Sequence, residues 1–361
     1  MKVLYLTNIH NPYRDEFFEQ LGQQCDLTVT FEAHGDDARD ESWFNGARGH
    51  SYREVFLPTG IAAGFKELRG IIAEGWDVVV VGCYNSKVQM LAIEHMRRRK
   101  IRYAVNLDGP LFYSKSSIKR AVRKHVLRGA DLYLVAGKTS VGSVRREVGA
   151  SDGKIVPYSF SSLTEAQLSA RAELHERREE NLILCVGQFL PYKGIDVLLD
   201  AFAGMQNEDL RLRLIGAGKR NVELEKAIAE RGLTDRAEAI AFMPPEELAL
   251  EYARAGLFVL PSRQECWGLV VNEAAACGCP IVSTWGAGAA VEFLYPEHVD
   301  LLVEPDDSES LRRVIVAALD RSAEDLEMYS SQLQGISGCY SIEAMAREHL
   351  VALASLARHA A

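Results

Sequence analysis

The sequence predicts an α/β protein with two doubly wound parallel sheets, each in its own domain. Three observations predict this fold class. The chain has 361 residues, too many for one ordinary hydrophobic core. Short apolar runs alternate with amphipathic stretches along the chain, which is the pattern of successive strand–helix–strand units. This pattern restarts after a turn-rich and then charged stretch at 158–180, where we place the domain boundary.

Apolar runs locate the expected strands. In the first half they lie at Val3–Leu6, Leu27–Phe31, Val78–Val81, Tyr103–Leu107 and Leu132–Val135, with helical patterns between them, for example Phe65–Ala73 and Lys87–Arg98. The second half repeats this order with Leu182–Val186, Leu212–Ile215, Ala239–Phe242, Leu257–Leu260, Ile281–Ser283 and Leu301–Val303. We therefore expect Rossmann-like domains at 1–160 and 161–340. A last helix in 341–361 begins after Ser341, a good N-cap.

Composition excludes several classes of protein. The chain is 48% hydrophobic and 25% charged, which is typical of a soluble globular protein. No apolar run approaches the roughly 18–20 residues of a membrane span, and the first eight residues lack a signal-peptide pattern. The seven cysteines form no paired framework, and Cys277 and Cys279 have no second pair of zinc ligands. We expect buried thiols and a cytoplasmic protein.

Charge is distributed unevenly. Residues 1–160 carry 23 Lys and Arg against 18 Asp and Glu, a net charge of +5. Residues 161–361 carry 18 against 32, a net charge of −14. The two halves are therefore expected to face different partners.

Residues 115–128 predict a basic amphipathic helix. They hold six Lys and Arg and no acidic residue, and Ile118, Val122 and Val126 recur at four-residue steps. This helix is either a solvated outer face or a contact to an anionic membrane surface or a lipid-diphosphate acceptor. Because no aromatic residues interleave with the basic ones, nucleic acid is disfavoured as a partner.

The most informative stretch is 257–284. The run that ends at Leu260 predicts a buried strand, and Pro261 and Ser262 begin a polar loop. A helix is expected to open at Trp267-Gly268 and to run to about Cys277, because Gly278 and Pro280 stop it before the next strand.

Two carboxylates stand eight positions apart in this stretch, Glu265 in the loop and Glu273 on the helix. The loop is expected to place Glu265 beside the helix N-terminus, whose free amides favour an anion. Glu273 would reach the same cavity from the side and accept hydrogen bonds from a ribose diol. Amides for a phosphate together with carboxylates for sugar hydroxyls describe a sugar-nucleotide pocket. The alternative is that both glutamates are ordinary solvated residues.

A second motif follows the strand that ends at Val186. Gly187 lets a phosphate approach the backbone at the carboxyl end of the sheet, and Lys193 supplies a cation just before a helix. Gly216 lies in a Gly-x-Gly turn after the next strand. No further glycine completes a dinucleotide fingerprint there, so NAD is disfavoured.

The stretch Pro-Ser-x-x-Glu-x-Trp-Gly-Leu-Val-x-x-Glu-Ala resembles the Glu-x7-Glu region of retaining glycosyltransferases of family 4, which have the two-domain GT-B fold with the domains facing across a cleft. The Gly187 to Gly194 stretch resembles that family's Gly-Arg-x-x-x-x-Lys-Gly motif, with Gln188 in place of the Arg. The resemblance implies that Lys193 and Glu265 are catalytic. It also implies a donor-binding set of Gly187, Gln188, Lys193, Gly216, Glu265, Cys266, Trp267, Gly268, Leu269 and Glu273.

The resemblance further implies the substrates. A hexosyl group would pass from a nucleoside-diphosphate sugar, a UDP-sugar rather than a GDP-sugar, to a hydroxyl of a glycan or lipid-linked acceptor. We expect no cofactor and no metal, because no Asp-x-Asp motif is present and Lys193 with helix amides would hold the diphosphate. The last helix is expected to cross back to the first domain.

In the first half, Tyr13, Arg14 and Asp108 are candidate residues of the acceptor or sugar side. Asp108 follows a strand at the position where family members often carry a His, and the loop before Tyr13 lacks the family's glycine pair. Packing at a helix start and turn formation are the alternatives for these residues.

Two other functions are considered. A sugar-nucleotide epimerase or hydrolase could share the GT-B scaffold, although it would not be expected to have the Glu265 to Glu273 spacing. A two-domain binding protein of periplasmic type would be expected to carry a signal peptide.

Overall fold

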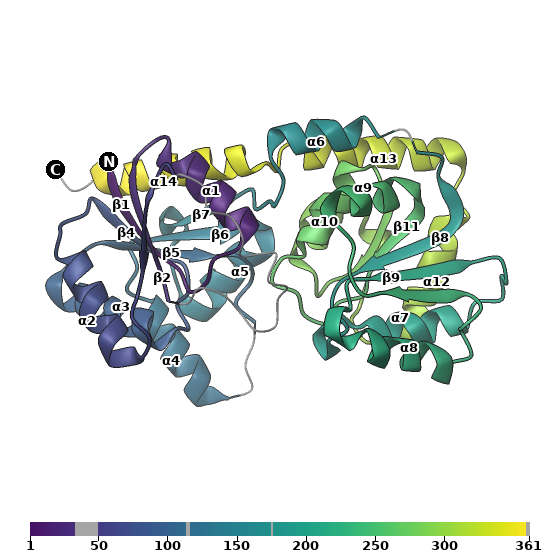
Figure 1. Cartoon of the computed structure of the whole chain (residues 1–361), viewed down its shortest axis with the longest axis horizontal. Helices are drawn as coiled ribbons and strands as arrows, with labels where there is room; N and C mark the ends of the chain where they lie inside the picture. Colours follow the sequence, from purple (N-terminus) through teal and green to yellow (C-terminus); the bar gives the residue numbers. More distant parts are fainter. Residues whose placement is uncertain (33–49, 113–115, 175, 359–361) are drawn as a thin grey trace. The chain divides into compact units, whose positions relative to one another are not determined.

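The structure is a computed structural model that describes residues 1–32, 50–112, 116–174 and 176–358 (Figure 1). Contacts divide the chain into two compact units. The first unit is Met1–Ser162 together with Ile342–Ala361, and the second is Leu163–Ser341. The sequence placed this boundary at 160/161 and the start of the last segment at 341.

The first unit is built on a parallel sheet with the order β3-β2-β1-β4-β5-β6-β7. Its strands are β1 Lys2–Leu6, β2 Asp26–Phe31, β3 Arg53–Phe56, β4 Val78–Val81, β5 Tyr103–Leu107, β6 Leu132–Ala136 and β7 Ile155–Tyr158. The helices are α1 Pro12–Gly22, α2 Ile61–Ile72, α3 Lys87–Arg99, α4 Ser117–Leu127 and α5 Gly137–Val148. The central strands are buried and consist mainly of apolar residues, as expected for a sheet covered on both faces.

Sequence reasoning missed the two edge strands of this sheet, β3 and β7. Strand β3 is half-buried and has no continuous apolar run, and β7 contains Pro157. Proline donates no hydrogen bond to the ladder and is tolerated at a sheet edge. Edge strands carry a weaker apolar signal than central ones because only one neighbour and part of each face cover them.

The last helix, α14 Ile342–Arg358, packs within the first unit. It lies beside α1 in Figure 1, and the ring of His349 contacts the ring of Phe17 with centroids 4.8 Å apart. Glu348 accepts a 2.7 Å hydrogen bond from the backbone N–H of Ser159. The chain thus returns to its first unit after the second is complete.

The second unit is built on a parallel sheet with the order β10-β9-β8-β11-β12-β13. Its strands are β8 Glu179–Val186, β9 Arg211–Ile215, β10 Ala237–Ile240, β11 Ala255–Leu260, β12 Ile281–Thr284 and β13 Leu302–Val303. Its helices are α6 Glu165–Ala172, α7 Ile195–Ala203, α8 Asn221–Glu230, α9 Pro245–Arg254, α10 Leu269–Ala276, α11 Gly288–Leu294, α12 Ser308–Leu319 and α13 Ala323–Ser337.

Two expectations for this unit are corrected. Strand β10 ends at Ile240 instead of Phe242, and Phe242 is 56% exposed because it lies beyond the sheet. Helix α10 begins at Leu269, since Gly268 adopts a left-handed conformation with φ of 98° and cannot be part of the helix.

Among the described residues, no helix is long and apolar enough to cross a membrane. All seven cysteines are free thiols. Burial raises the pKa of the thiols of Cys185, Cys277 and Cys279 to about 12, so these thiols are unreactive packing residues at neutral pH.

Candidate functional site

The predicted second-unit residues gather at one point of the sheet. In the order β10-β9-β8-β11-β12-β13, the chain moves outward in one direction from β8 and in the other from β11. Ligands of open α/β sheets bind at such a topological switch point, outside the carboxyl ends of the strands. Gly187 directly follows β8, and Glu265 lies in the loop after β11.

Lys193 and Glu265 form an ion pair at this switch point. The Lys193 ammonium contacts the Glu265 carboxylate at Oε2, and both side chains are mostly buried, with exposed fractions of 15% and 13%. Ser262 also donates to Oε2, at 3.4 Å. Because partly buried charges are weakly screened, this pair is a strong local dipole. A ligand with both kinds of group can place its phosphate against Lys193 and its hydroxyls against Glu265.

The loop that carries Lys193 is held against the loop after β11. Pro191–Lys193 form a single 3₁₀ turn, and the carbonyl of Tyr192 accepts the N–H of Arg263 at 2.9 Å. Gly194 then adopts a left-handed conformation with φ of 67°, and a Cβ added there would overlap the carbonyl oxygen of Pro261. Glycine at 194 is therefore required for the two loops to meet.

Arg263, which is not part of the Lys193–Glu265 pair, also holds the loops after β8 and β11 in place. Its guanidinium donates to both carboxylate oxygens of Asp196, at 2.8 and 2.7 Å, and contacts Asp306. The hydrogen bond from Arg263 is the largest cause that lowers the pKa of Asp196. Sequence reasoning missed Gly194 and Arg263 as supports. The glycine directly after Lys193 was the available signal in the sequence.

The backbone of Glu265 is tied to a third loop. Its N–H donates to the Gly286 carbonyl at 2.8 Å, and the residue forms an isolated parallel bridge with Ala287. Gly286 lies so close to Ser262 that an added Cβ would be 2.5 Å from the Ser262 carbonyl oxygen. The loop after β12 therefore helps to position Glu265.

The residues at the start of α10 differ in how far their side chains are exposed to a ligand. Trp267 is 2% exposed and donates its indole N–H to the Asn272 side chain at 2.9 Å, so its side chain packs in the core and does not face a ligand. If Trp267 belongs to the donor-binding set, it does so through its backbone and not through its indole ring. Cys266 is exposed, Gly268 is buried and Leu269 is half-buried at the helix start.

Glu273 lies on α10, as expected. It is half-buried, and its carboxylate accepts the hydroxyl of Tyr252 at 3.3 Å. Burial, followed by the charge of Glu273, raises the pKa of Tyr252 well above its ordinary value, so this hydroxyl stays a donor. Tyr252 is thus a support for Glu273 that the sequence did not indicate.

Two further predicted residues lie near the pair or its strand end. Gly216 follows β9, and a Cβ added there would be 3.5 Å from the backbone nitrogen of Gly187. Gly187 faces the Lys193 side chain, whose nearest atoms lie 3.7 Å from the position of a Cβ. Gln188 is exposed next to them.

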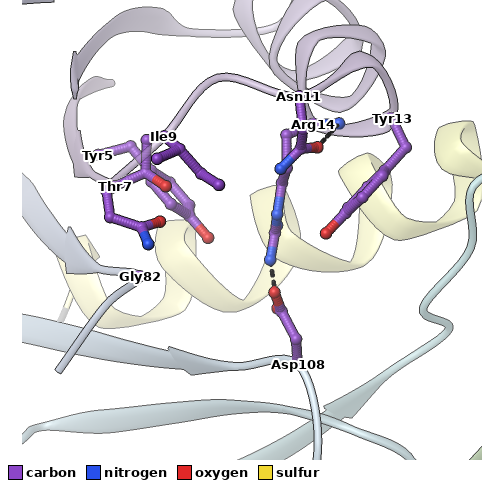
Figure 2. Close-up of a pocket in the computed structure, with 9 residues that line it drawn as sticks. Tyr5, Thr7, Ile9, Asn11, Tyr13, Arg14, Gly82 and Asp108 are labelled. Atoms are coloured by element: carbon purple, nitrogen blue, oxygen red, sulfur yellow. Dashed lines mark hydrogen bonds and ion pairs between the residues drawn. The ribbon is translucent and has the colours of Figure 1, made fainter. Parts of the chain in front are cut away.

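The first-unit candidates are also brought together. Arg14 on α1 contacts the carboxylate of Asp108, which follows β5 (Figure 2). Tyr13 lies alongside, with its ring centroid 5.9 Å from the Arg14 guanidinium carbon. One nitrogen of the Arg14 guanidinium is thus engaged by Asp108.

The basic helix is present as α4, and its residues divide into two sets. Ile118 and Val122 are exposed to 74% and 47%, whereas Val126 is buried. Arg123 is not on the exposed face, because it donates to Glu147 and to the Phe112 carbonyl, both at 2.6 Å. Lys115 lies outside the described residues.

Among the described residues, one group of His and carboxylate side chains has a spacing that could hold a metal ion: His10, His50 and Glu54. His10 lies 3.0 Å from both Asp15 and Glu54. The hydrogen bond to Asp15 is the largest cause that raises the pKa of His10. His10 therefore has two carboxylate partners of its own.

Part of the chain is similar to known glycosyltransferases. Residues 167–332, which include the Lys193–Glu265 pair, match the family of glycosyl transferases group 1. The chain is 37% identical over 129 residues to a D-inositol 3-phosphate glycosyltransferase of Segniliparus rotundus, covering 34% of this chain and 29% of the relative. It is 36% identical over 152 residues to an MMP alpha-(1->4)-mannosyltransferase of Mycolicibacterium hassiacum, covering 41% and 37%. These matches span well under half the length of the relatives.

Solved structures match over nearly the whole chain. A sucrose-phosphate synthase from Thermosynechococcus elongatus gives a TM-score of 0.77 at 20% identity, covering 100% of both chains. The Anabaena protein Alr3699/HepE in complex with UDP gives 0.77 at 18% identity, covering 98% of this chain and 100% of that one. The chain has the GT-B fold of two Rossmann-like domains, which confirms the predicted fold class.

Proposed function

We propose that this chain is a retaining glycosyltransferase that moves a hexosyl group from a nucleoside-diphosphate sugar to an acceptor hydroxyl. The observation that carries the proposal is the Lys193–Glu265 pair at the switch point of the second sheet, inside the stretch that matches glycosyl transferases group 1. A cation and a carboxylate at the carboxyl ends of adjacent strands suit a sugar diphosphate.

The chemistry follows from the charges at this site. When the glycosidic bond breaks, its electron pair stays on the leaving diphosphate, and the new negative charge is stabilised by the Lys193 ammonium. Glu265 then accepts hydrogen bonds from hydroxyls of the sugar. The acceptor hydroxyl attacks from the face that the diphosphate leaves, and its proton passes to the departing phosphate oxygen. No metal is needed where a lysine and helix amides balance the charge.

The nucleoside of the donor is proposed to be uridine. The Anabaena protein Alr3699/HepE was solved in complex with UDP and with UDP-glucose, whereas a related mannosyltransferase of Mycolicibacterium smegmatis is GDP-mannose-dependent. A thermal-shift panel of UDP- and GDP-sugars tests this choice. The largest rise in Tm is expected for a UDP-sugar, and a rise with GDP-sugars alone would contradict it.

The reaction type is tested by incubating donor and protein in EDTA, with and without glycan or lipid-linked acceptors. Transfer that needs an acceptor and survives EDTA supports the proposal. Release of free sugar or inversion of a sugar centre without acceptor would favour the alternative, a hydrolase or epimerase on the same scaffold. A strict need for Mg²⁺ or Mn²⁺ would contradict the metal-independent mechanism.

Glu273→Ala is expected to weaken donor binding by about 2–3 kcal/mol, because a carboxylate that accepts ribose hydroxyls is lost. The same variant also removes the carboxylate that accepts the Tyr252 hydroxyl. Tyr252→Phe is the matched control, and it should leave the donor affinity within a few-fold of wild type. Calorimetric titration measures both, and an unchanged affinity in Glu273→Ala would remove the ribose role.

The exposed face of α4 is proposed to contact an anionic membrane that carries the acceptor. Lys119 and Lys124 are exposed beside Ile118 and Val122, in the half with net charge +5. Each basic side chain near an anionic surface contributes about 1 kcal/mol. The protein would then be a cytoplasmic protein that binds peripherally to the membrane surface.

Replacing Lys119 and Lys124 with Ser is therefore expected to weaken sedimentation with anionic liposomes about 30-fold at low salt. Replacing Arg98 and Arg99, exposed on α3, removes the same charge from the same unit and is the control. If both double variants sediment equally, or wild type does not sediment, α4 is a solvated face and the acceptor is better sought among small molecules.

A further inference from the structure

A cavity of about 120 Å³ opens at the carboxyl end of the first sheet (Figure 2). It lies beside β1, β4 and β5, and its lining includes Tyr5, Thr7, Arg14, Gly82 and Asp108. In the order β3-β2-β1-β4-β5-β6-β7 the direction of the chain changes between β1 and β4. The cavity therefore occupies the ligand-binding position of the first unit, by the same rule that locates the Lys193–Glu265 site in the second.

Arg14 brings an incompletely satisfied charge to this cavity. The residue is 5% exposed, and its Nη2 contacts Asp108, but the buried Nη1 has no hydrogen-bond partner among the described residues. Arginine does not lose its proton at any ordinary pH, so the charge persists. A buried donor without an acceptor is costly, and an oxygen ligand would relieve that cost.

The hydroxyl of Tyr5 is a second unsatisfied group at the same place. Tyr5 is 1% exposed. Burial raises the pKa of its hydroxyl, and the charge of Arg14 together with a hydrogen bond from Arg14 lowers it, so the Tyr5 oxygen lies within reach of the guanidinium. The hydroxyl proton has no acceptor among the described residues. Figure 2 shows the hydroxyl beside the Arg14 side chain. Gly82 makes room for this ring, because an added Cβ would lie 2.9 Å from a Tyr5 ring carbon. Glycine at position 82 is therefore what allows the Tyr5 ring to lie here.

Asp108 offsets part of the Arg14 charge and is fixed by three donors. Its Oδ1 accepts from Arg14, from Asn106 at 2.7 Å and from the Tyr158 hydroxyl at 2.8 Å. Asn106 is itself held by His349 of α14, with Oδ1 and Nε2 2.8 Å apart. Three donors on one oxygen hold the carboxylate in place, so Arg14 keeps Nη1 for another acceptor.

We propose that this cavity binds an oxyanion group, a phosphate or a carboxylate, through Arg14 Nη1 and the Tyr5 hydroxyl. Two hydrogen-bond donors, one of them charged, favour an anionic oxygen ligand over a neutral one. The volume is below the roughly 300–1,000 Å³ of pockets for drug-sized ligands, so the cavity takes one group and not a whole nucleotide sugar. Resting on the function proposed above, we assign this group to the acceptor, which then carries an acidic substituent.

The test is calorimetric titration of the full chain with inorganic phosphate and with acetate. Tyr5→Phe removes only the hydroxyl and is expected to weaken phosphate binding about fivefold, with an unchanged or higher Tm. Tyr103→Phe is the matched control. Its hydroxyl is also buried without a partner among the described residues, but Tyr103 is the first residue of β5 and lies at the opposite end of the strand from the cavity. This control should bind phosphate like wild type.

Asp108→Asn is expected to change the affinity for phosphate in the opposite direction. It removes a negative charge beside Arg14 while keeping an acceptor oxygen, so phosphate should bind about tenfold more tightly. If neither anion binds wild type, or if Tyr5→Phe and Tyr103→Phe bind alike, the proposal is wrong. A loss of binding in Asp108→Asn, together with a lowered Tm, would mean that Arg14 and Asp108 only hold α1 to the sheet.

A second series of titrations, in saturating UDP, identifies the source of the anion. Phosphate binding that persists, with UDP affinity equal in Tyr5→Phe and wild type, supports an acceptor group. Phosphate binding that UDP abolishes, with UDP affinity lowered in Tyr5→Phe, would overturn that assignment in favour of the donor diphosphate. If no nucleotide binds, the proposed function is contradicted. The phosphate titrations would still decide whether the oxyanion site exists.

Discussion

Replacing Lys193 with alanine is expected to lower the turnover number by at least about two orders of magnitude. Its ammonium is mostly buried beside Gly187 and Glu265. It is therefore placed to stabilise charge that develops on a leaving diphosphate, where water is largely excluded. Because this charge appears mainly in the transition state, the loss should exceed the loss of donor affinity. Steady-state kinetics with saturating donor measures it.

The control for this variant is Lys226→Ala, which removes a lysine with a 76% exposed side chain from α8 in the same unit. It should keep the activity of the wild type. A Lys193→Ala protein that turns over at a similar rate would show that the pair with Glu265 only holds two loops together. Lys193→Arg, which keeps the charge in a different shape, should retain more activity than the alanine variant.

Gly194→Ala is expected to abolish measurable donor binding. A left-handed conformation costs about 1–2 kcal/mol for alanine, and the added Cβ would also overlap the carbonyl of Pro261. The loop that carries Lys193 would then have to leave the loop that carries Glu265. Donor titration and urea unfolding measure the loss of binding and of stability.

Gly232→Ala separates the effect of backbone strain from the effect of the overlap with Pro261. Gly232 has φ of 68°, nearly that of Gly194, but an added Cβ would meet nothing within 4 Å. It therefore reports the backbone strain alone, and this variant should bind the donor normally. If Gly194→Ala binds as well as Gly232→Ala, the close approach of the two loops is not needed for the site.

The meeting of the second-unit candidates at one edge of the sheet could be predicted from the sequence because these residues lie in continuous motifs. Gly187 and Lys193 follow one strand, and Glu265 precedes one helix. The alternation of strands and helices then brings these stretches to one edge of the sheet. The orientation of Trp267 could not be predicted, because a motif position does not reveal whether a side chain or only its backbone faces the ligand. Its indole is buried against Asn272.

The first-unit cavity could be predicted only in part. Arg14 and Asp108 were singled out separately, and their contact joins residues 94 positions apart. Tyr5 reads as an ordinary apolar strand residue, and nothing in the sequence shows that its hydroxyl lacks a partner. Asn106 within the buried strand β5 was the available signal, since a buried amide needs partners. Those partners include His349, 243 residues away.

The central claim is that the switch point of the second sheet binds a nucleoside-diphosphate sugar without a metal. Calorimetric titration with UDP-glucose and GDP-mannose, in EDTA, tests it most directly. The wild type and Lys226→Ala should each bind one donor molecule per chain, and the combined Lys193→Ala and Glu273→Ala variant should bind at least about 100-fold more weakly. Equal binding by all three proteins, or no binding by the wild type, would contradict the claim.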